Sequence, residues 1–277
     1  MLLTALYVPA SRPERWPKAA ASGADAVIVD LEDAVPAQQK DPSRANVVEH
    51  IAEIAGVAVQ LRINAVGSAW HEADVTAVAG LPSSVEVRVP KCEDPAELRE
   101  LSQRLGGRAL HVLVESALGV ERAFDLARVQ GVVSVSLGEA DLRSELGASA
   151  PQALGWIRGR LVCASHAAGL GAPMGPMFAR VGDREGLVDT TRELRTYGFL
   201  GRTVIHPSQI GAVLEAHRPS PEEVSLARQV VGSAAEQDGA IVLEDGSFLD
   251  RAMLGQHRLI LELAARLDAT APVDPSP

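Results

Sequence analysis

The sequence has few cysteines, a deficit of basic residues and no long hydrophobic run. Its two cysteines, Cys92 and Cys163, are too few for a disulfide framework or a tetrahedral thiolate zinc site. Lysine and arginine total 26 against 36 aspartate and glutamate residues, which gives a formal net charge of −10. This charge disfavours a nucleic-acid or anionic-membrane partner that is bound through bulk electrostatics.

The apolar residues are not arranged as membrane or export segments either. No segment reaches the run of about 20 apolar residues that a membrane span needs. The N-terminal stretch MLLTALYVPASRPER has a short apolar run and no basic residue before it, unlike a signal peptide. We therefore expect a cytoplasmic protein in a reducing compartment, with no membrane partner.

Hydrophobic residues are abundant, at 47% of the chain against 22% charged residues, so the protein can bury a large core. Short apolar runs, several of them continuous as in strands buried on both faces, alternate with helical stretches. The runs begin at residues 3, 25, 58, 85, 110, 132, 171 and 202. The clearest helical stretches are 94–105, 121–129, 153–170 and 184–198.

Eight strands, each followed by a helix, predict an α/β fold of the (β/α)8 TIM-barrel type over residues 1–217. A doubly wound open sheet is the alternative, but its first turn is usually rich in glycine. The first turn here, VPASRPER, contains no glycine. We therefore favour the barrel.

Residues 218–277 form a predicted C-terminal extension. Ser220 and Glu223 have the spacing of a helix-capping box, and a further helix should follow them. Asp245–Gly246 predicts the turn of a short hairpin before a last helix, and the final residues should be disordered.

Charged residues follow most of the predicted strands, where the active site of a barrel lies. Glu115 and Asp141 come at the ends of two consecutive strands, so their carboxylates can meet. Mg²⁺ prefers one or two carboxylates, and with no His or Cys nearby in sequence zinc is disfavoured. The pair could instead be neutralised by Arg143 or Arg122.

A group of basic residues follows the first two predicted strands, although the protein as a whole is acidic. Its members are Arg12, Arg15, Lys18, Lys40 and Arg44. A basic rim at the mouth of a barrel predicts an anionic ligand with phosphates. The alternative is ordinary charge on helix surfaces.

Several motifs together resemble the CoA-ester lyases of the citrate lyase β-subunit-like group, within the HpcH/HpaI aldolase superfamily. They occur in order from Tyr7 to Ile210 and read YVPASRPER, DAVIVDLEDAVP, LRINAVGSAWHEAD, VRVPK, LVESALG, LGEADLRSELG and GFLGRTVIHPSQI. The sequence departs from the usual pattern at several positions, among them Leu118, where many members have arginine, and Gly175, where aspartate is common. Because of these departures, the motifs do not specify the identity of the substrate.

The resemblance implies a (β/α)8 barrel that assembles as a homotrimer or hexamer, with Mg²⁺ held by Glu115 and Asp141. It also implies that Arg62 contacts the reacting oxygens and that Asp250, on a lid over a neighbouring subunit's site, donates a proton. The positions that match the CoA site are Tyr7, Lys18, Ile205, His206 and Pro207.

The implied reaction is the reversible cleavage of a 3-hydroxyacyl-CoA, such as citramalyl-CoA or malyl-CoA, to acetyl-CoA and a 2-oxo acid. One alternative is a class II aldolase that acts on free 2-oxo acids without CoA. Another is a citrate lyase β-subunit-like protein that works only within a larger complex.

Overall fold

The computed structural model describes residues 1–236, 241–242, 248–249 and 254–268. The chain divides into two compact units, Met1–Val213 and Leu214–Pro277. The division into 1–217 and 218–277 as functional domains stays a prediction. Asp250, the predicted proton donor, and the Asp245–Gly246 turn lie outside the described residues.

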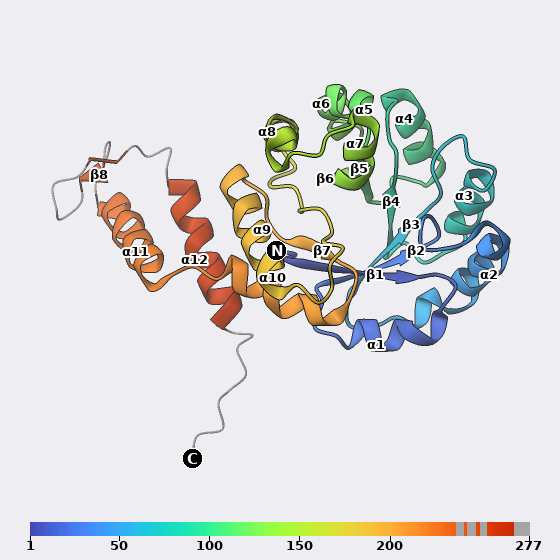
Figure 1. Ribbon diagram of the computed structural model, residues 1–277, viewed down its shortest axis with the longest axis horizontal. Coiled ribbons are helices and arrows are strands. Elements are labelled where there is room, and N and C mark those ends of the chain that lie inside the picture. Colours follow the sequence, from blue (N-terminus) through green and yellow to red (C-terminus); the bar gives the residue numbers. More distant parts are fainter. Residues whose placement is uncertain (237–240, 243–247, 250–253, 269–277) are drawn as a thin grey trace, which may run out of the picture. The chain divides into compact units, whose positions relative to one another are not determined.

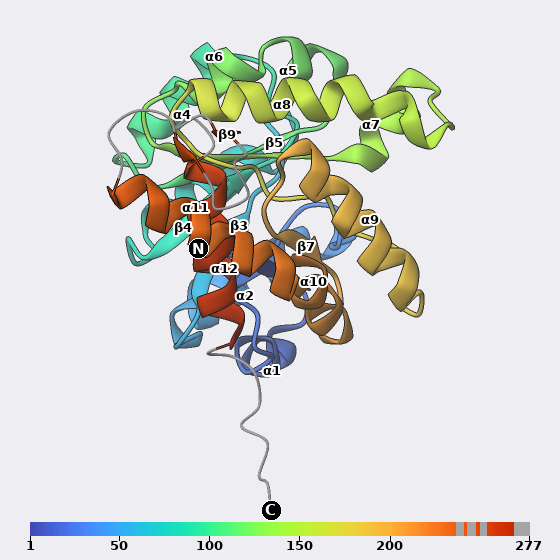
Figure 2. The ribbon, with the colours of Figure 1, turned by 90° about the vertical axis from the view of Figure 1, so that its left-hand side faces the viewer.

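The first unit contains a curled parallel sheet of seven strands with helices along its outer side (Figures 1 and 2). The strand order across the sheet is β6-β5-β4-β3-β2-β1-β7. The strands are β1 (Thr4–Pro9), β2 (Ala26–Asp30), β3 (Ala58–Arg62), β4 (Val85–Val89), β5 (Leu110–Val114), β6 (Val132–Leu137) and β7 (Arg202–Val204). Seven of the eight predicted strands are thus confirmed.

The predicted strand at residues 171–174 is the exception. Met174 makes a single parallel bridge to Ser136 of β6, and Gly175 makes one to Arg202 of β7. Pro173 and Pro176 on either side of this pair have no N–H group to donate to a strand ladder, which keeps the segment from becoming a regular strand. Two bridging residues therefore stand between the edge strands where an eighth strand was expected.

The register of the central strands places charged residues in one row. Asp30 at the end of β2 pairs with Arg62 at the end of β3, and Arg62 pairs with Arg88 in β4. Because parallel strands present their carboxyl ends at the same edge of a sheet, this row lies at the edge where barrel active sites form. The register thus brings together residues that are far apart in sequence.

Helices follow each of the strands and bury apolar faces against the sheet. They are α1 (Trp16–Ala20), α2 (Lys40–His50), α3 (His71–Ala79), α4 (Pro95–Arg104), α5 (Ala117–Glu121), α6 (Ala123–Ala127), α7 (Glu139–Leu146), α8 (Gly155–Ala167), α9 (Arg184–Tyr197) and α10 (Ile210–His217). The four clearest predicted helices are confirmed as α4, α6, α8 and α9. Asp94 begins α4 by accepting a bond from the Ala96 amide, and Gly198 ends α9 with φ +98°.

The second unit contains helices α11 (Pro221–Glu236) and α12 (Leu254–Asp268) and the antiparallel strand pair β8 (Ile241–Val242) and β9 (Phe248–Leu249). The predicted capping box is present, because the Ser220 amide donates to Glu223 and the Glu223 amide donates to the Ser220 hydroxyl. The predicted hairpin pairing and last helix are also confirmed. Within the described residues, no helix has the length and apolarity needed to cross a membrane.

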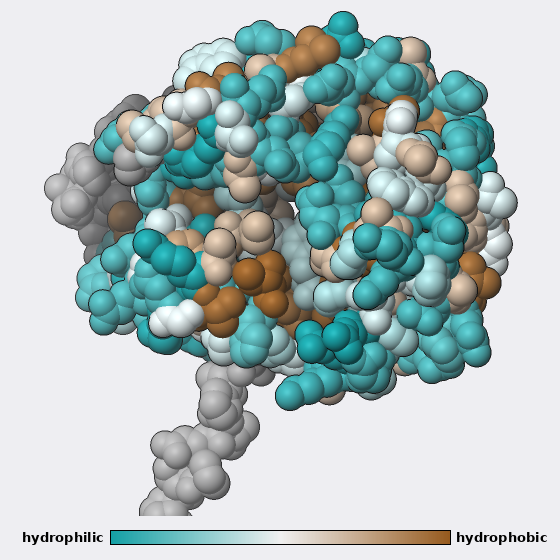
Figure 3. Space-filling view, turned by 45° about the vertical axis from the view of Figure 1, so that its right-hand side comes forward, coloured by the Kyte–Doolittle hydropathy of each residue, from teal (hydrophilic) through white to brown (hydrophobic). Residues whose placement is uncertain are grey.

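The core of the first unit lies between the outer face of the sheet and the helices, where residues such as Leu61, Val87 and Val112 are fully buried. On the inner face, Ala5, Ala26 and Ile28 pack together beneath Tyr7 and Met174. The surface in Figure 3 is mostly hydrophilic, with hydrophobic residues in small groups. Burial of the apolar residues in the core thus agrees with the composition.

Candidate active site

A cavity of about 490 Å³ lies at the carboxyl ends of the strands. It brings together five of the predicted site residues, which are Tyr7, Arg62, Glu115, Asp141 and Ile205. Residues 7 and 205 come from or follow strands that are adjacent in the sheet, although nearly two hundred positions separate them in sequence. The fold therefore assembles most of the predicted site in one place.

Arg62 is held in this cavity by three acidic residues, one at the end of β2 and two in the loop after it. Its Nε and Nη2 atoms donate to the two carboxylate oxygens of Asp30, at 2.7 and 2.6 Å. Its Nη1 atom lies 2.8 Å from Glu32 and donates to Asp33 at 3.4 Å, and its guanidinium lies 5.0 Å from the centre of the Tyr7 ring. Burial would lower the pKa of Arg62, but the charge and hydrogen bonds of Asp30 raise it. Arg62 is thus a fixed, permanently charged donor.

Lys91 joins two of the strand ends. Its amide donates to Glu115 at 2.7 Å, and its ammonium donates to Glu32 at 2.6 Å. Lys91 has φ +50°, a left-handed conformation that is uncommon for a residue with a side chain. The same residue therefore orients the carboxylate of Glu115 and neutralises that of Glu32.

Glu115 and Asp141 are close enough to share a hydrogen bond. Burial raises the pKa of Glu115 to about 8, and the hydrogen bond with Asp141 and the charge of Glu32 raise it in the same direction. Gly138 permits this approach, because a Cβ atom there would lie 2.5 Å from the Cβ of Glu115. The absence of a side chain at Gly138 therefore leaves room for Glu115 beside the end of β6.

This donor set fits a hard divalent cation. Two carboxylates that lie together in a buried site gain an opposite charge when a cation binds. Within the described part of the chain, no three His, Cys, Asp or Glu residues are grouped to hold one metal ion. The geometry therefore matches an ion such as Mg²⁺, which takes one or two carboxylates and completes its shell with water and substrate oxygens.

The predicted basic rim is wrong for two of its members, because Lys40 and Arg44 point inward. The Lys40 ammonium is buried and donates to the carbonyls of Leu31 and Glu32 and to the side chain of Asn64, at 2.6–2.7 Å. Arg44 donates to Asp74 at 2.7 Å, and Asp74 accepts from Asn64. These contacts hold the loop that carries the acids around Arg62. A lysine at the start of a helix looks the same in sequence whether it turns inward or outward.

Arg88 was not predicted, although it lines the cavity and is almost fully buried. Its Nε and Nη2 atoms donate to Gln60 at 3.1 and 2.8 Å, and its Nη1 atom donates to Ser136 at 2.9 Å. Burial lowers the pKa of Arg88. Arg88 stands in the apolar run VEVRVP, one residue before β4 ends at Val89, and alternation along the strand places it on the same face as Glu86.

Three of the residues matched to a CoA site do not line this cavity. Lys18 is exposed on α1, and His206 is exposed and accepts a bond from the Ser208 amide at the start of the short helix Pro207–Gln209. Roles for Lys18, His206 and Pro207 in binding CoA stay predictions.

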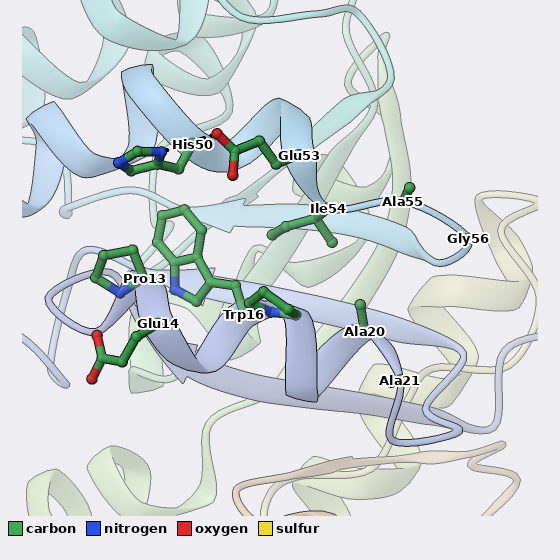
Figure 4. Close-up of a pocket in the computed structure, with 11 residues that line it drawn as sticks. Pro13, Glu14, Trp16, Ala20, Ala21, His50, Glu53, Ile54, Ala55 and Gly56 are labelled. Carbon is green, nitrogen blue, oxygen red and sulfur yellow. Dashed lines mark hydrogen bonds and ion pairs between the residues drawn. The ribbon is translucent and has the colours of Figure 1, made fainter.

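A second cavity of about 620 Å³ lies beside α1 and is lined by Trp16, His50 and Glu53 among others (Figure 4). None of the predicted site residues lines it.

Comparisons with known proteins agree with the sequence motifs. A sequence model described as HpcH/HpaI aldolase/citrate lyase matches residues 3–207. The chain is 34% identical over 267 residues to a citrate lyase subunit beta-like protein of Mycobacterium tuberculosis, covering 94% of each. It is 29% identical over 293 residues to mitochondrial citramalyl-CoA lyase of Rattus norvegicus, covering 95% of this chain and 86% of that protein.

Among solved structures, the chain is similar to the protein CitE of Mycobacterium tuberculosis in complex with magnesium, acetoacetate and coenzyme A. The two superpose with a TM-score of 0.81 at 32% identity, over 95% of this chain and 98% of the other. The likeness therefore extends through both units of the chain.

Proposed function

The chain belongs to the HpcH/HpaI aldolase/citrate lyase family, and from this premise we propose that it is a magnesium-dependent lyase of CoA esters. Its substrate would be a 3-hydroxyacyl-CoA such as citramalyl-CoA or malyl-CoA, and its products acetyl-CoA and a 2-oxo acid. The observation that carries the proposal is the cavity in which Arg62 stands beside the hydrogen-bonded pair of Glu115 and Asp141. The citramalyl-CoA lyase and the CoA-bound relative support the substrate class.

We also infer that the sheet is a complete (β/α)8 barrel, with Met174–Gly175 in the place of the remaining strand. The bridges of these two residues to β6 and β7 support this topology. In such a barrel the carboxyl ends of the strands surround one mouth, which is where the cavity lies.

Glu115 and Asp141 are the residues that would hold Mg²⁺. When bound, the ion supplies a Lewis acid for the carboxylate and carbonyl oxygens of a 2-oxo acid. The Lys91 amide fixes one Glu115 oxygen at 2.7 Å and so orients this carboxylate before any ion arrives.

Cleavage breaks the bond between the hydroxyl-bearing carbon and the carbon next to the thioester, and the electron pair moves to the thioester as an enolate. The hydroxyl loses its proton and becomes the carbonyl of the 2-oxo acid, and the enolate carbon gains a proton, so no net proton is consumed. Arg62 would stabilise the negative charge that develops on oxygen; loss of such a donor costs about 3 kcal/mol. Asp250 would protonate the enolate carbon.

Two further expectations belong to this proposal. Tyr7 and Ile205 line the cavity and, with Lys18, His206 and Pro207, would hold the CoA portion. A homotrimer or hexamer in the cytoplasm is the expected assembly and location.

The proposal is tested by incubating purified protein and Mg²⁺ with a panel of hydroxyacyl-CoA thioesters. We expect acetyl-CoA and a 2-oxo acid to appear, and a chelator to stop their release. Release of free CoA with an intact hydroxy acid would indicate thioester hydrolysis and contradict the proposal. Cleavage of free hydroxy acids without CoA would indicate a class II aldolase, and activity only after addition of partner subunits would indicate part of a larger complex.

Asp250→Asn gives a separate test of the proton donor. We expect turnover to fall while Mg²⁺ affinity, measured by calorimetry, stays near that of the wild type. Loss of Mg²⁺ binding in this variant would contradict the role proposed for Asp250.

A further inference from the structure

The two sides of the cavity differ in chemistry. The side formed by β2 to β5 carries the charged groups Asp30, Arg62, Arg88 and Glu115. The bridging segment and the end of β7, together with Leu137 and Ala140, form a chiefly apolar surface, whereas Glu139 and Asp141 after β6 belong with the charged groups. The side chains of the apolar surface are those of Leu137, Ala140, Pro176, Met177, Ala179 and Ile205. We call this second set the apolar wall.

The basic residues behind the apolar wall are turned away from the cavity and are engaged elsewhere. Arg202 donates to the carbonyl of Pro176 at 2.8 Å and to the hydroxyls of Thr190 and Thr191. Arg158 donates to both carboxylate oxygens of Glu139, at 2.7 and 3.0 Å. These guanidinium groups are therefore committed to protein acceptors rather than to a ligand.

Arg180 directly follows Ala179 of the wall in sequence and pairs with Asp183 at 3.0 Å. Two uncharged polar side chains lie beside the wall: Ser136 accepts from Arg88 at 2.9 Å, and Thr203 donates its hydroxyl to the carbonyl of Gly175 at 3.3 Å. In the described part of the chain, no lysine, arginine or histidine side chain lines the cavity on the side of the apolar wall.

The charges that line the cavity are already unbalanced toward the negative. Two arginines face five acids, so the formal sum is 2 − 5 = −3, and a divalent cation would leave −1. The acids are Asp30, Asp33, Glu115, Glu139 and Asp141. Arg62, held by Asp30 and Glu32, is the donor assigned to the reacting oxygen, and Arg88 is bonded to Gln60 and Ser136. The cavity can therefore compensate one substrate carboxylate at the metal, but it has no free cation for a second.

A second carboxylate against the apolar wall would lose its water without gaining an opposite charge. Burial of an ionised carboxylate is costly unless a charge or hydrogen-bond donors replace its solvent. An alkyl group in the same place loses water favourably instead. The wall thus discriminates between these two substituents by desolvation as well as by charge.

We infer that the site selects a 2-oxo acid whose substituent is alkyl rather than a second carboxylate, which narrows the proposed lyase function and rests on it. The favoured keto acids are pyruvate and 2-oxobutyrate, and the disfavoured one is oxaloacetate. The corresponding thioester is a 3-hydroxyacyl-CoA with a methyl or ethyl group on the hydroxyl-bearing carbon.

The test is calorimetric binding of pyruvate, 2-oxobutyrate and freshly dissolved oxaloacetate to the full chain in the presence of Mg²⁺. We expect pyruvate and 2-oxobutyrate to bind at least about fivefold more tightly than oxaloacetate. Equal or tighter binding of oxaloacetate would overturn the inference and leave the proposed function standing. If none of the three acids binds, the inference is wrong, and the thioester assay of the proposed function, which includes malyl-CoA, decides that function separately.

A charge placed on the apolar wall sharpens the test. Met177 lines the cavity and is 46% exposed, so Met177→Lys adds a cation at the mouth without a buried charge. We expect this variant to improve oxaloacetate binding relative to pyruvate by about fivefold. Val181 is 39% exposed on the same segment but does not line the cavity, so Val181→Lys is the matched control and should leave the ratio unchanged. An unchanged ratio in Met177→Lys, or an equal change in Val181→Lys, would contradict the inference.

Discussion

The side of the cavity formed by β2 to β5 and the side formed by the bridging segment and the end of β7 are built in different ways. On the first side, four regular strands hold charged side chains in register, and each charge has a partner within the protein. On the second side, Met174 and Gly175 contribute one backbone bridge each, and the side chains at the cavity are mostly apolar. The regular strands hold charged side chains in fixed positions, and the irregular segment lines the cavity with apolar side chains.

This difference shows where the fold can tolerate ionic chemistry. A buried charge is stable when its partners are held in place by hydrogen-bonded strands, as Asp30 is for Arg62. The closing segment has too few ladder bonds to hold such a network. We therefore expect chemistry on the first side and substrate selection on the second.

The largest expected effect comes from the carboxylate pair formed by Glu115 after β5 and Asp141 after β6. Glu115→Gln and Asp141→Asn each replace a charged oxygen ligand by a neutral amide of nearly the same size. We expect turnover to fall by more than about 100-fold, with a parallel loss of Mg²⁺ affinity. Substitution of a residue that only supports a metal ligand costs up to about 100-fold, so a larger loss is the effect expected of a ligand itself.

Asp125→Asn is the control for this pair, because Asp125 is an exposed acid on α6 and does not line the cavity. Its turnover should equal that of the wild type. Retained Mg²⁺-dependent turnover in Asp141→Asn would mean that this carboxylate pair does not hold the metal.

The next largest effect concerns the stability of the charged side. Lys40→Met removes the ammonium that donates to the Leu31 and Glu32 carbonyls and to the Asn64 side chain. The Glu32 carbonyl keeps the Val35 amide as a donor, but the Leu31 carbonyl and the Asn64 side-chain oxygen lose this partner. We expect the free energy of unfolding to fall by about 3 kcal/mol, measured by urea denaturation. Lys18→Met, at an exposed position, should change it by no more than about 0.5 kcal/mol. Equal effects in the two variants would show that Lys40 does not hold the loop.

The regular side of the barrel could be predicted from sequence to a large extent. Continuous apolar runs predicted the positions of β1 to β7, because strands that are buried on both faces are apolar along most of their length. The meeting of Glu115 with Asp141 followed from their places at consecutive strand ends. Arg88 was missed because one charged residue within an apolar run does not show which partners, here Gln60 and Ser136, would satisfy it.

The closing side and the loop contacts could not be predicted in the same way. The run GAPM from Gly171 was expected to be a strand, but the prolines at 173 and 176 limit its hydrogen bonding to two bridges. Lys40 and Arg44 were expected on the surface, and their burial depends on tertiary partners such as Asp74 and Asn64. Such contacts depend on the assembled fold and not on local pattern.

A smaller effect is expected from the polar residues inside the barrel. His111 is buried, with ring nitrogens 2.8 Å from Glu86 and 2.7 Å from Ser134. Burial lowers the pKa of His111, although Glu86 opposes this. The unfolded chain therefore takes up this proton at higher pH than the folded protein, so stability should fall as pH drops below about 6.5.

Urea denaturation between about pH 5 and pH 8 tests this expectation. The pH slope of the wild type should exceed that of His111→Gln by up to about 1.4 kcal/mol per pH unit. Identical slopes in the two proteins would show that His111 takes up its proton equally in both states.

The smallest expected effect is a difference in reactivity between the two cysteines. Modification of the reactive thiol should leave activity unchanged. Cys92 directly follows β4 on the charged side and is 5% exposed, and burial raises the pKa of its thiol to about 12. Cys163 is exposed on α8, which contacts β6. Because the thiolate is the reactive form, we expect a disulfide reagent at about pH 8 to modify one thiol per folded chain. Cys163→Ser should abolish this reaction and Cys92→Ser should preserve it. Rapid modification of Cys92 in the folded protein would show that the charged side opens to solvent, and its ion pairs would then be too exposed to orient a substrate.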